Sequence, residues 1–175
     1  MLDIGTGSGR LAIELAKANP DWQITGIDVS ENMLKIARED AAQFVFSDRI
    51  DFRQAPAKAL PFPDEHFALV TSNASLHLWE DPLKVFKEIA RVTAPGGYCF
   101  IRDNLRLTVL CPLLNLIGGA MGMNTSQRRL WMQAIRSSYT IGEVKAILRN
   151  SALKDARVIY IPGILFLGIE WRKSY

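Results

Sequence analysis

Short apolar runs alternate along this chain with stretches in which apolar residues recur every three to four positions. The apolar runs predict five buried strands, at residues 2–4, 22–27, 50–53, 67–72 and 98–101. The stretches between them predict amphipathic helices, and Ser30 and Asp81 are the expected caps of two of these. Strands that alternate with helices build a mainly parallel sheet covered on both faces. The pattern therefore predicts an α/β fold.

The end of the chain has a different pattern. Thr140 and Glu143 have the spacing of a capping box and predict one more helix. Two strand-like runs follow, at residues 157–161 and 164–171, and only a Pro-Gly pair separates them. Parallel neighbours need a longer crossover, so this pair is expected to form an antiparallel hairpin. The prediction thus reaches seven strands.

The composition is that of one ordinary globular domain over residues 1–175, with 49% apolar and 22% charged residues. The net charge of +3 is carried by scattered Lys and Arg, apart from the Arg128-Arg129 pair, so we expect no nucleic-acid partner. Two cysteines make no disulfide framework and no secretory leader is visible, which favours a cytoplasmic protein. The spacing of histidines and cysteines predicts no metal site.

The stretch Leu107–Met123 carries no charge. It is short for a membrane span, which needs about 20 predominantly apolar residues, and Pro112 and three glycines interrupt it. We interpret it as a buried or pocket-lining segment within a substrate-side insertion at residues 104–139. Contact with a membrane surface or with a second copy of the chain is left open.

A glycine-rich turn lies between the first strand and the first helix. Gly5, Gly7 and Gly9 allow backbone conformations barred to other residues and a close approach of a ligand, which the turn's amides would face. The helix that follows presents unpaired N–H groups to the same place. A dinucleotide fingerprint would need a glycine at Arg10, so the spacing is G-x-G-x-G instead. A tight turn without a ligand is the alternative.

Six motifs occur in the order found in class I S-adenosylmethionine-dependent methyltransferases: LDIGTGSG, GIDVS, ALPFPDEHF, SNASLHLWEDP, EIARVTAPGG and SYTIGEVKAIL. The chain resembles this family over nearly its full length, especially the small-molecule group that includes quinone-biosynthesis C-methyltransferases. The resemblance implies a Rossmann-like three-layer sandwich with strand order 3-2-1-4-5-7-6 and an antiparallel strand 7. It implies S-adenosylmethionine as the cofactor, bound across the carboxyl ends of the strands.

The resemblance also implies which residues hold the cofactor. Asp28 would bind both ribose hydroxyls as an acceptor-only carboxylate, although an aspartate here could instead start the helix capped by Ser30. Asp3 would position the methionyl amino group. The remaining residues implied at the cofactor are Gly5, Thr6, Gly7 and Gly9 around the methionyl part, Val29 and Met33 beside the nucleoside, Ala57 at the adenine, and Asn73; Met33 could equally be core.

Three features depart from the family. Pro56 stands where a family Asp or Asn meets the adenine amino group, and Ala68 stands where strand four usually has Asp. The first strand is short, and the helices that precede it in the family are missing. We therefore expect an N-terminally truncated chain, a misassigned start or an unusually open site.

The implied reaction is in-line methyl transfer to a small apolar or aromatic acceptor, giving S-adenosylhomocysteine. His77 is a candidate general base, or a loop histidine that orients its neighbours. Trp79 would stack on a flat acceptor, or cap the core. A nucleic-acid methyltransferase would carry Asn/Asp-Pro-Pro-aromatic where this chain has residues 72–75. A cofactor-binding module without turnover is the alternative from another functional class.

Overall fold

A single seven-stranded sheet organises the chain. The structure, a computed structural model, describes residues 1–107, 111–161 and 166–175. The strand order is β3-β2-β1-β4-β5-β7-β6, and β7 runs antiparallel to both of its neighbours. The predicted order and the terminal hairpin are thus confirmed, while the connection at residues 162–165 lies outside the described residues.

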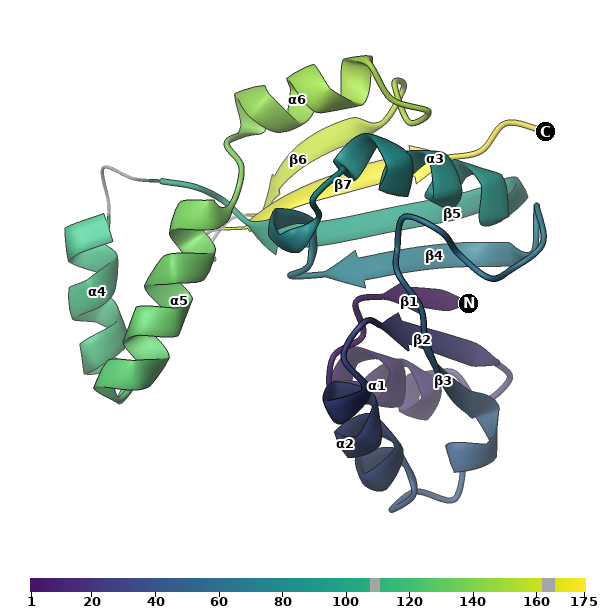
Figure 1. Ribbon diagram of the computed structural model, residues 1–175, viewed down its shortest axis with the longest axis horizontal. Helices are drawn as coiled ribbons and strands as arrows, with labels where there is room; N and C mark the ends of the chain where they lie inside the picture. Colours follow the sequence, from purple (N-terminus) through teal and green to yellow (C-terminus); the bar gives the residue numbers. More distant parts are fainter. Residues whose placement is uncertain (108–110, 162–165) are drawn as a thin grey trace.

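The seven strands follow in the predicted order (Figure 1), and helices α4 and α5 are added in the segment for which no helix was predicted. The first half contains β1 (Leu2–Ile4), α1 (Arg10–Ala18), β2 (Ile24–Asp28), α2 (Glu31–Ala41), η1 (Ser47–Arg49), β3 (Ile50–Gln54) and β4 (Phe67–Asn73). The second half contains η2 (Leu76–Leu78), α3 (Pro82–Val92), β5 (Thr93–Asn104), α4 (Cys111–Ala120), α5 (Thr125–Ser137), α6 (Ile141–Arg149), β6 (Arg157–Ile161) and β7 (Phe166–Arg172).

Two apolar clusters lie on opposite faces of the sheet. Because side chains alternate along a strand, Ile24 and Ile27 of β2 point to different faces. Ile24 packs with α1 and α2, whereas Ile27 belongs to the larger cluster formed with α3 and α6. This arrangement gives the three layers that the sequence predicted.

Strand β1 is short, as predicted, but it is held on both sides. Its three residues are at most 1% exposed, and they pair in parallel with β2 and with β4. The Met1 ammonium also donates to the carbonyl oxygen of Gln23 at 2.6 Å. Pairing and burial therefore fix the start of the glycine turn.

Predicted caps are confirmed, while two strand boundaries differ from the prediction. The side chains of Ser30 and Asp81 accept backbone N–H groups at the starts of α2 and α3. Strand β2 begins at Ile24 rather than at Trp22, because Trp22 forms a turn with Asn19. Strand β5 spans twelve residues rather than four; it begins directly after α3, where Gly96 takes φ +72°.

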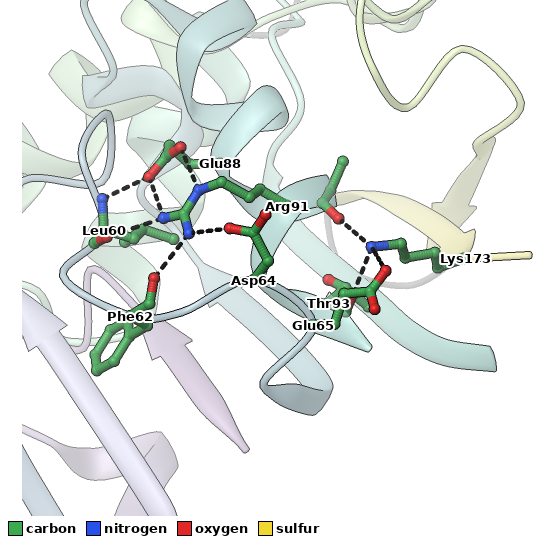
Figure 2. Close-up of polar contacts among 9 residues, drawn as sticks. Leu60, Phe62, Asp64, Glu65, Glu88, Arg91, Thr93 and Lys173 are labelled. Atoms are coloured by element: carbon green, nitrogen blue, oxygen red, sulfur yellow. Dashed lines mark hydrogen bonds and ion pairs between the residues drawn. The ribbon is translucent and has the colours of Figure 1, made fainter. Parts of the chain in front are cut away.

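The loop between β3 and β4 is tied to α3 by one arginine (Figure 2). Arg91 donates to the carbonyl oxygens of Leu60 and Phe62 at 2.9 and 2.7 Å, and to Asp64 at 2.8 Å. It also forms a two-bond pair with Glu88, whose carboxylate accepts the Leu60 N–H. The loop that carries the ALPFPD motif is therefore fixed by the helix that carries the EIARV motif.

The uncharged segment is more exposed than predicted. Helix α4 packs on α5 through Cys111 and Leu114, but Leu113, Leu116 and Ile117 are 52%, 70% and 40% exposed. The expectation of a buried or pocket-lining segment is therefore wrong for these side chains, because α4 lies beside α5 beyond the ends of β4 and β5 (Figure 1) rather than against the sheet. No described helix is both long and apolar enough to cross a bilayer.

Candidate functional site

Two adjoining cavities lie where β1, β2 and β4 end. The first has a volume of about 450 Å³ and is lined by Asp3, Thr6, Gly7, Met33 and Asn73 among others; we call it the glycine-turn cavity. The second has a volume of about 420 Å³ and is lined by Val29, Ala57 and Trp79 among others; we call it the β2-side cavity. Gly5, Asp28, Ser75 and Leu78 line both. Most of the predicted site residues therefore meet at one edge of the sheet.

The carboxylate of Asp28 stands between the two cavities. Its Oδ2 accepts the backbone N–H of Gly7 at 2.9 Å, and its Oδ1 accepts the backbone N–H of Ser30 at 2.9 Å. The aspartate therefore joins the glycine turn to the start of α2. A carboxylate offers about four acceptor positions, so two remain for donors on a ligand. Two adjacent hydroxyl groups, such as those of a ribose, match that capacity.

Asp3 is a buried carboxyl group at the floor of the glycine-turn cavity. It is 1% exposed, and it accepts the hydroxyls of Thr6 and Thr71 at 2.7 and 3.1 Å. Burial raises its pKa to about 6, against the opposing effect of the two hydroxyl donors. A cationic ligand group in this cavity would favour the ionised form of Asp3.

The sequence led us to expect that the amides of the turn face the ligand, but not all of them point to the cavity. The N–H groups of Gly5 and Thr6 donate to the Ile27 carbonyl oxygen, and Gly9 donates to the Thr6 carbonyl oxygen. The cavity is reached instead by Ser8, Arg10 and Leu11 at the start of α1, which the sequence reasoning did not single out. The first amides of a helix lack intrahelical partners, so this end of α1 offers donors to an anion or a carbonyl.

The glycines at the ends of the turn serve close packing. A Cβ at Gly5 would lie 2.8 Å from the Cβ of Ser75, and one at Gly9 would lie 2.6 Å from the Phe52 ring. Gly9 lines neither cavity. Its small size instead lets α1 approach β3, a role that glycine has in nucleotide-binding turns.

Two further predicted contacts lie at the β2-side cavity. Ala57 and the departing residue Pro56 both line it, together with Val29, which is 67% exposed. At Ala68, the other departure from the family, the pairing of β4 with β5 shifts register between Phe67 and Leu69. Pro56 itself offers no side-chain acceptor to this cavity, which Glu80 and Asp81 also line.

Trp79 has a place in both the cavity and the core. Its ring lines the β2-side cavity and meets the Phe86 ring edge-on, with centroids 5.8 Å apart. It lies with Ala57 and Asp28 on the same cavity, away from Asn73. The contact with Phe86 agrees with core capping, while stacking of Trp79 on an acceptor stays a prediction.

His77 is joined to an aspartate that the sequence analysis did not identify. Its Nδ1 lies 2.8 Å from Oδ1 of Asp103, and its backbone N–H donates to Oδ2 of the same residue at 2.9 Å. The side chains are 7% and 2% exposed. His77 therefore bonds neither Asn73 nor Trp79, and it lines neither cavity. The position of Asp103 near the end of β5 was the available signal, because ligands of such folds bind at strand ends.

Known proteins share this arrangement. The methyltransferase domain family matches residues 2–101. Demethylmenaquinone methyltransferase of Chlorobaculum tepidum is 37% identical, over 97% of this chain and 73% of that protein. The 27-O-demethylrifamycin SV methyltransferase of Amycolatopsis mediterranei is 41% identical over 105 residues, or 60% of this chain and 38% of that protein. This chain spans less than half of the length of several curated relatives.

A solved structure agrees over the whole fold. A candidate S-adenosyl-L-methionine-dependent methyltransferase of Methanococcus maripaludis matches with a TM-score of 0.79 and 26% identity, over 99% of this chain and 77% of that one. The family match covers more than half of the present chain. The chain belongs to the class I S-adenosylmethionine-dependent methyltransferases, as its six motifs predicted.

Proposed function

We propose that this chain transfers the methyl group of S-adenosylmethionine to a small apolar or aromatic acceptor. The observation that carries the proposal is the pair of adjoining cavities with the Asp28 carboxylate between them. Such a pair suits a ligand with a nucleoside at one end and an amino acid at the other. The products would be the methylated acceptor and S-adenosylhomocysteine.

The residues present fit this cofactor in charge and shape. Asp28 retains two acceptor positions for the ribose hydroxyls. Val29, Ala57 and Trp79 supply a largely apolar wall for the adenine in the β2-side cavity. Asp3 supplies a negative charge in the glycine-turn cavity, where the ammonium and sulfonium groups would lie. Met33, whose terminal methyl is 3.6 Å from where a Cβ of Gly7 would lie, covers the same cavity.

The chemistry requires little from the side chains beyond positioning. The bound cofactor supplies an electrophilic methyl group on a sulfonium. Holding an acceptor in line with it can contribute on the order of 7–11 kcal/mol through proximity alone. We assign that positioning to the cavity walls and to the loop between β4 and α3, which carries Ser75, Leu78 and Trp79.

We propose His77 as the group that takes a proton from an acidic acceptor. Its Nδ1 is held by Asp103, which leaves Nε2 to face an acceptor, and no hydrogen bond to Nε2 is seen among the described residues. Because His77 lies outside both cavities, the acceptor would approach from the β5 side. An aspartate that fixes the tautomer of a histidine is a familiar support for general-base chemistry.

The acceptor class is inferred from the relatives and from residues 104–139. The relatives are named for demethylmenaquinone and for 27-O-demethylrifamycin SV. We propose that residues 104–139 form the substrate side of the domain, because they begin at the last residue of β5, one residue after Asp103. The region contains four arginines and no acidic residue, and its uncharged stretch at residues 107–123 suits an uncharged ring system.

Calorimetry and product release test the proposal together. The 175-residue chain is titrated with S-adenosylmethionine and then assayed for S-adenosylhomocysteine release against quinols, phenols and aliphatic alcohols. We expect binding, and release with at least one aromatic acceptor. Binding without release for every acceptor would favour a cofactor-binding module, and absence of binding would contradict both functions. Asp28→Ala is the matched negative control, because it removes the ribose acceptor.

A further inference from the structure

Helix α4 exposes an apolar face that the fold leaves uncovered. Leu113, Leu116 and Ile117 are 52%, 70% and 40% exposed, and the helix carries no charged residue. Met121, directly beyond its end, is 68% exposed. A helix that is apolar around most of its circumference is usually buried in protein or in lipid. We therefore expect another surface to cover these exposed apolar side chains.

The opposite side of α4 already has a partner in α5. Cys111 and Leu114 are buried there, and the glycines of α4 bring the two helices close together. A Cβ at Gly118 would lie 3.1 Å from the Trp131 ring, and one at Gly119 would lie 3.2 Å from a guanidinium nitrogen of Arg128. The exposed leucines thus form a separate face that α5 does not cover.

The charge of this region is one-sided. Between Asp103 and Glu143 the sequence has no acidic residue, and it has four arginines in a chain of net charge +3. Arg106 pairs with Glu143. Within the described ranges, the three arginines of α5 (Arg128, Arg129, Arg136) form no ion pair. Their charge is thus available to an anionic partner.

We propose that the α4–α5 pair, residues 111–137, docks on the surface of an anionic phospholipid bilayer. Leu113, Leu116 and Ile117 would enter the boundary between headgroups and acyl chains, as in interfacial helices. Packed helices lie about 8–10 Å apart, which is near the Debye length of about 8 Å at physiological salt. The arginines are carried by α5, which packs directly against α4, so they would attract the phosphates of the same lipid surface.

A hollow between the two helices supports the lipid over other partners. It has a volume of about 490 Å³ and is lined by Arg129 and Arg136 together with apolar Met132 and Cys111. Such a mixture suits a phosphate headgroup with its glycerol. A nucleic acid would leave the leucine face uncovered, and a second copy would bring arginine toward arginine. The bilayer is the partner that uses both the apolar face and the charge.

Co-sedimentation with vesicles tests the proposal without any need for methyl transfer. The chain is mixed with vesicles of phosphatidylcholine alone, or of phosphatidylcholine with one quarter phosphatidylglycerol, at low and high salt. We expect binding to the anionic vesicles that weakens with salt. Each arginine near such a surface is worth about fivefold in partitioning, so Arg129→Gln with Arg136→Gln should weaken binding about 25-fold.

Matched variants separate the apolar and charged contributions. Leu113→Gln with Leu116→Gln should weaken binding about tenfold, because these side chains leave water on docking. Lys87→Gln with Arg149→Gln removes the same charge from α3 and α6, and Val45→Gln removes a fully exposed apolar side chain outside α4; both control variants should bind as the parent does. Three outcomes would each overturn the proposal. The first is an equal loss of vesicle binding in the Lys87 and Arg149 control, and the second is vesicle binding that does not change in the leucine variant. The third is a dimer that depends on the leucines in a chain that does not bind vesicles.

Discussion

The Oδ2 atom of Asp28 accepts the backbone N–H of Gly7 at 2.9 Å, which joins the end of β2 to the turn after β1. The two residues are 21 positions apart in the sequence, and the parallel pairing of the strands brings their ends together. The aspartate thereby has two functions at once. It fixes the turn, and it keeps acceptor positions free between the two cavities.

Asp28→Asn should weaken S-adenosylmethionine binding by about 10- to 100-fold. A hydrogen bond to a charged group contributes about 1.5–3 kcal/mol to binding, and the amide nitrogen of asparagine cannot accept a hydrogen bond from a hydroxyl. Calorimetry gives the dissociation constant. Asp51→Asn is the control, because Asp51 lies exposed on β3 and pairs with Arg53. Equal affinity of the Asp28 variant and the parent would rule out the ribose assignment.

Binding of the cationic cofactor should depend on pH through Asp3. The pKa of this buried carboxyl group is raised to about 6, and a sulfonium or ammonium group favours its ionised form. Affinity should therefore be constant above pH 7 and fall up to tenfold per pH unit below about 6. Asp3→Asn should give weak binding without this dependence. A parent affinity that stays flat between pH 5 and 8 would refute the role of Asp3.

The same carboxyl group should affect the stability of the ligand-free chain in the opposite direction. Its folded-state pKa is above its unfolded value, so its favourable contribution is complete below about pH 4 and is lost as pH rises through about 6. The melting temperature of Asp3→Asn relative to the parent should therefore rise between pH 4 and pH 7. Thermal unfolding across that range measures the difference, and a relative melting temperature that falls with pH would contradict it.

Gly5 should tolerate alanine much less well than Gly122. Both residues have positive φ, at 70° and 80°, so both substitutions incur backbone strain of about 1–3 kcal/mol. Only at Gly5 would the new Cβ meet another side chain, that of Ser75; at Gly122 nothing lies within 4 Å. Urea unfolding should therefore show a larger loss for Gly5→Ala, accompanied by weaker cofactor binding. Equal losses would show that backbone strain alone decides the cost.

Arg91→Ala should lower the free energy of unfolding by about 2–4 kcal/mol. The substitution removes the guanidinium donors from the carbonyl oxygens of Leu60 and Phe62 and from the Glu88 carboxylate, which keeps only the Leu60 N–H (Figure 2). Arg91→Lys should recover only part of this, because an ammonium group lacks the planar fork of donors. Lys17→Ala, which breaks an exposed pair with Glu14, should cost at most about 0.5 kcal/mol. Urea unfolding compares the three variants, and similar values for all would contradict this assignment.

The fold was predictable because its signals are local. Alternating apolar runs gave the parallel strands, and the short connection after residue 161 required a hairpin. The starts of β2 near Trp22 and of β5 near Gly96 were harder to predict from the sequence. A turn with Asn19 decides the first, and pairing with the end of the chain decides the second. The first contact is a short turn and the second joins distant parts of the chain, and neither leaves a periodic pattern in the sequence.

The position of Asp28 at the candidate site was predictable, because the end of β2 carries it to the cavities. The packing of Ser75 against Gly5 and the pairing of His77 with Asp103 depend on how β4 and β5 lie beside one another. The exposure of Leu116 could not be predicted either, because an uncharged stretch is equally consistent with a buried and an unpartnered helix. Side-chain neighbours from separate strands are therefore what the structure adds.

The pair formed by His77 and Asp103 should act on turnover rather than on cofactor affinity. Both side chains lie outside the two cavities, so His77→Gln should leave the dissociation constant of S-adenosylmethionine within about twofold of the parent value. If His77 removes the acceptor proton, kcat should fall by about 10²- to 10⁴-fold, the usual contribution of general-base catalysis. Asp103→Asn should lower kcat less than His77→Gln does, because the imidazole itself is kept.

The control for this prediction is the second histidine. His66 lies exposed beside Phe67 at the start of β4, whereas the β4–α3 loop follows the other end of that strand, and His66→Gln should change neither parameter. A loss of kcat in His77→Gln with an unaltered pH–rate profile would show that the imidazole only supports the loop. Because Asp103 also accepts the N–H groups of His77 and Asn104, thermal unfolding of each variant separates loss of the fold from loss of the base.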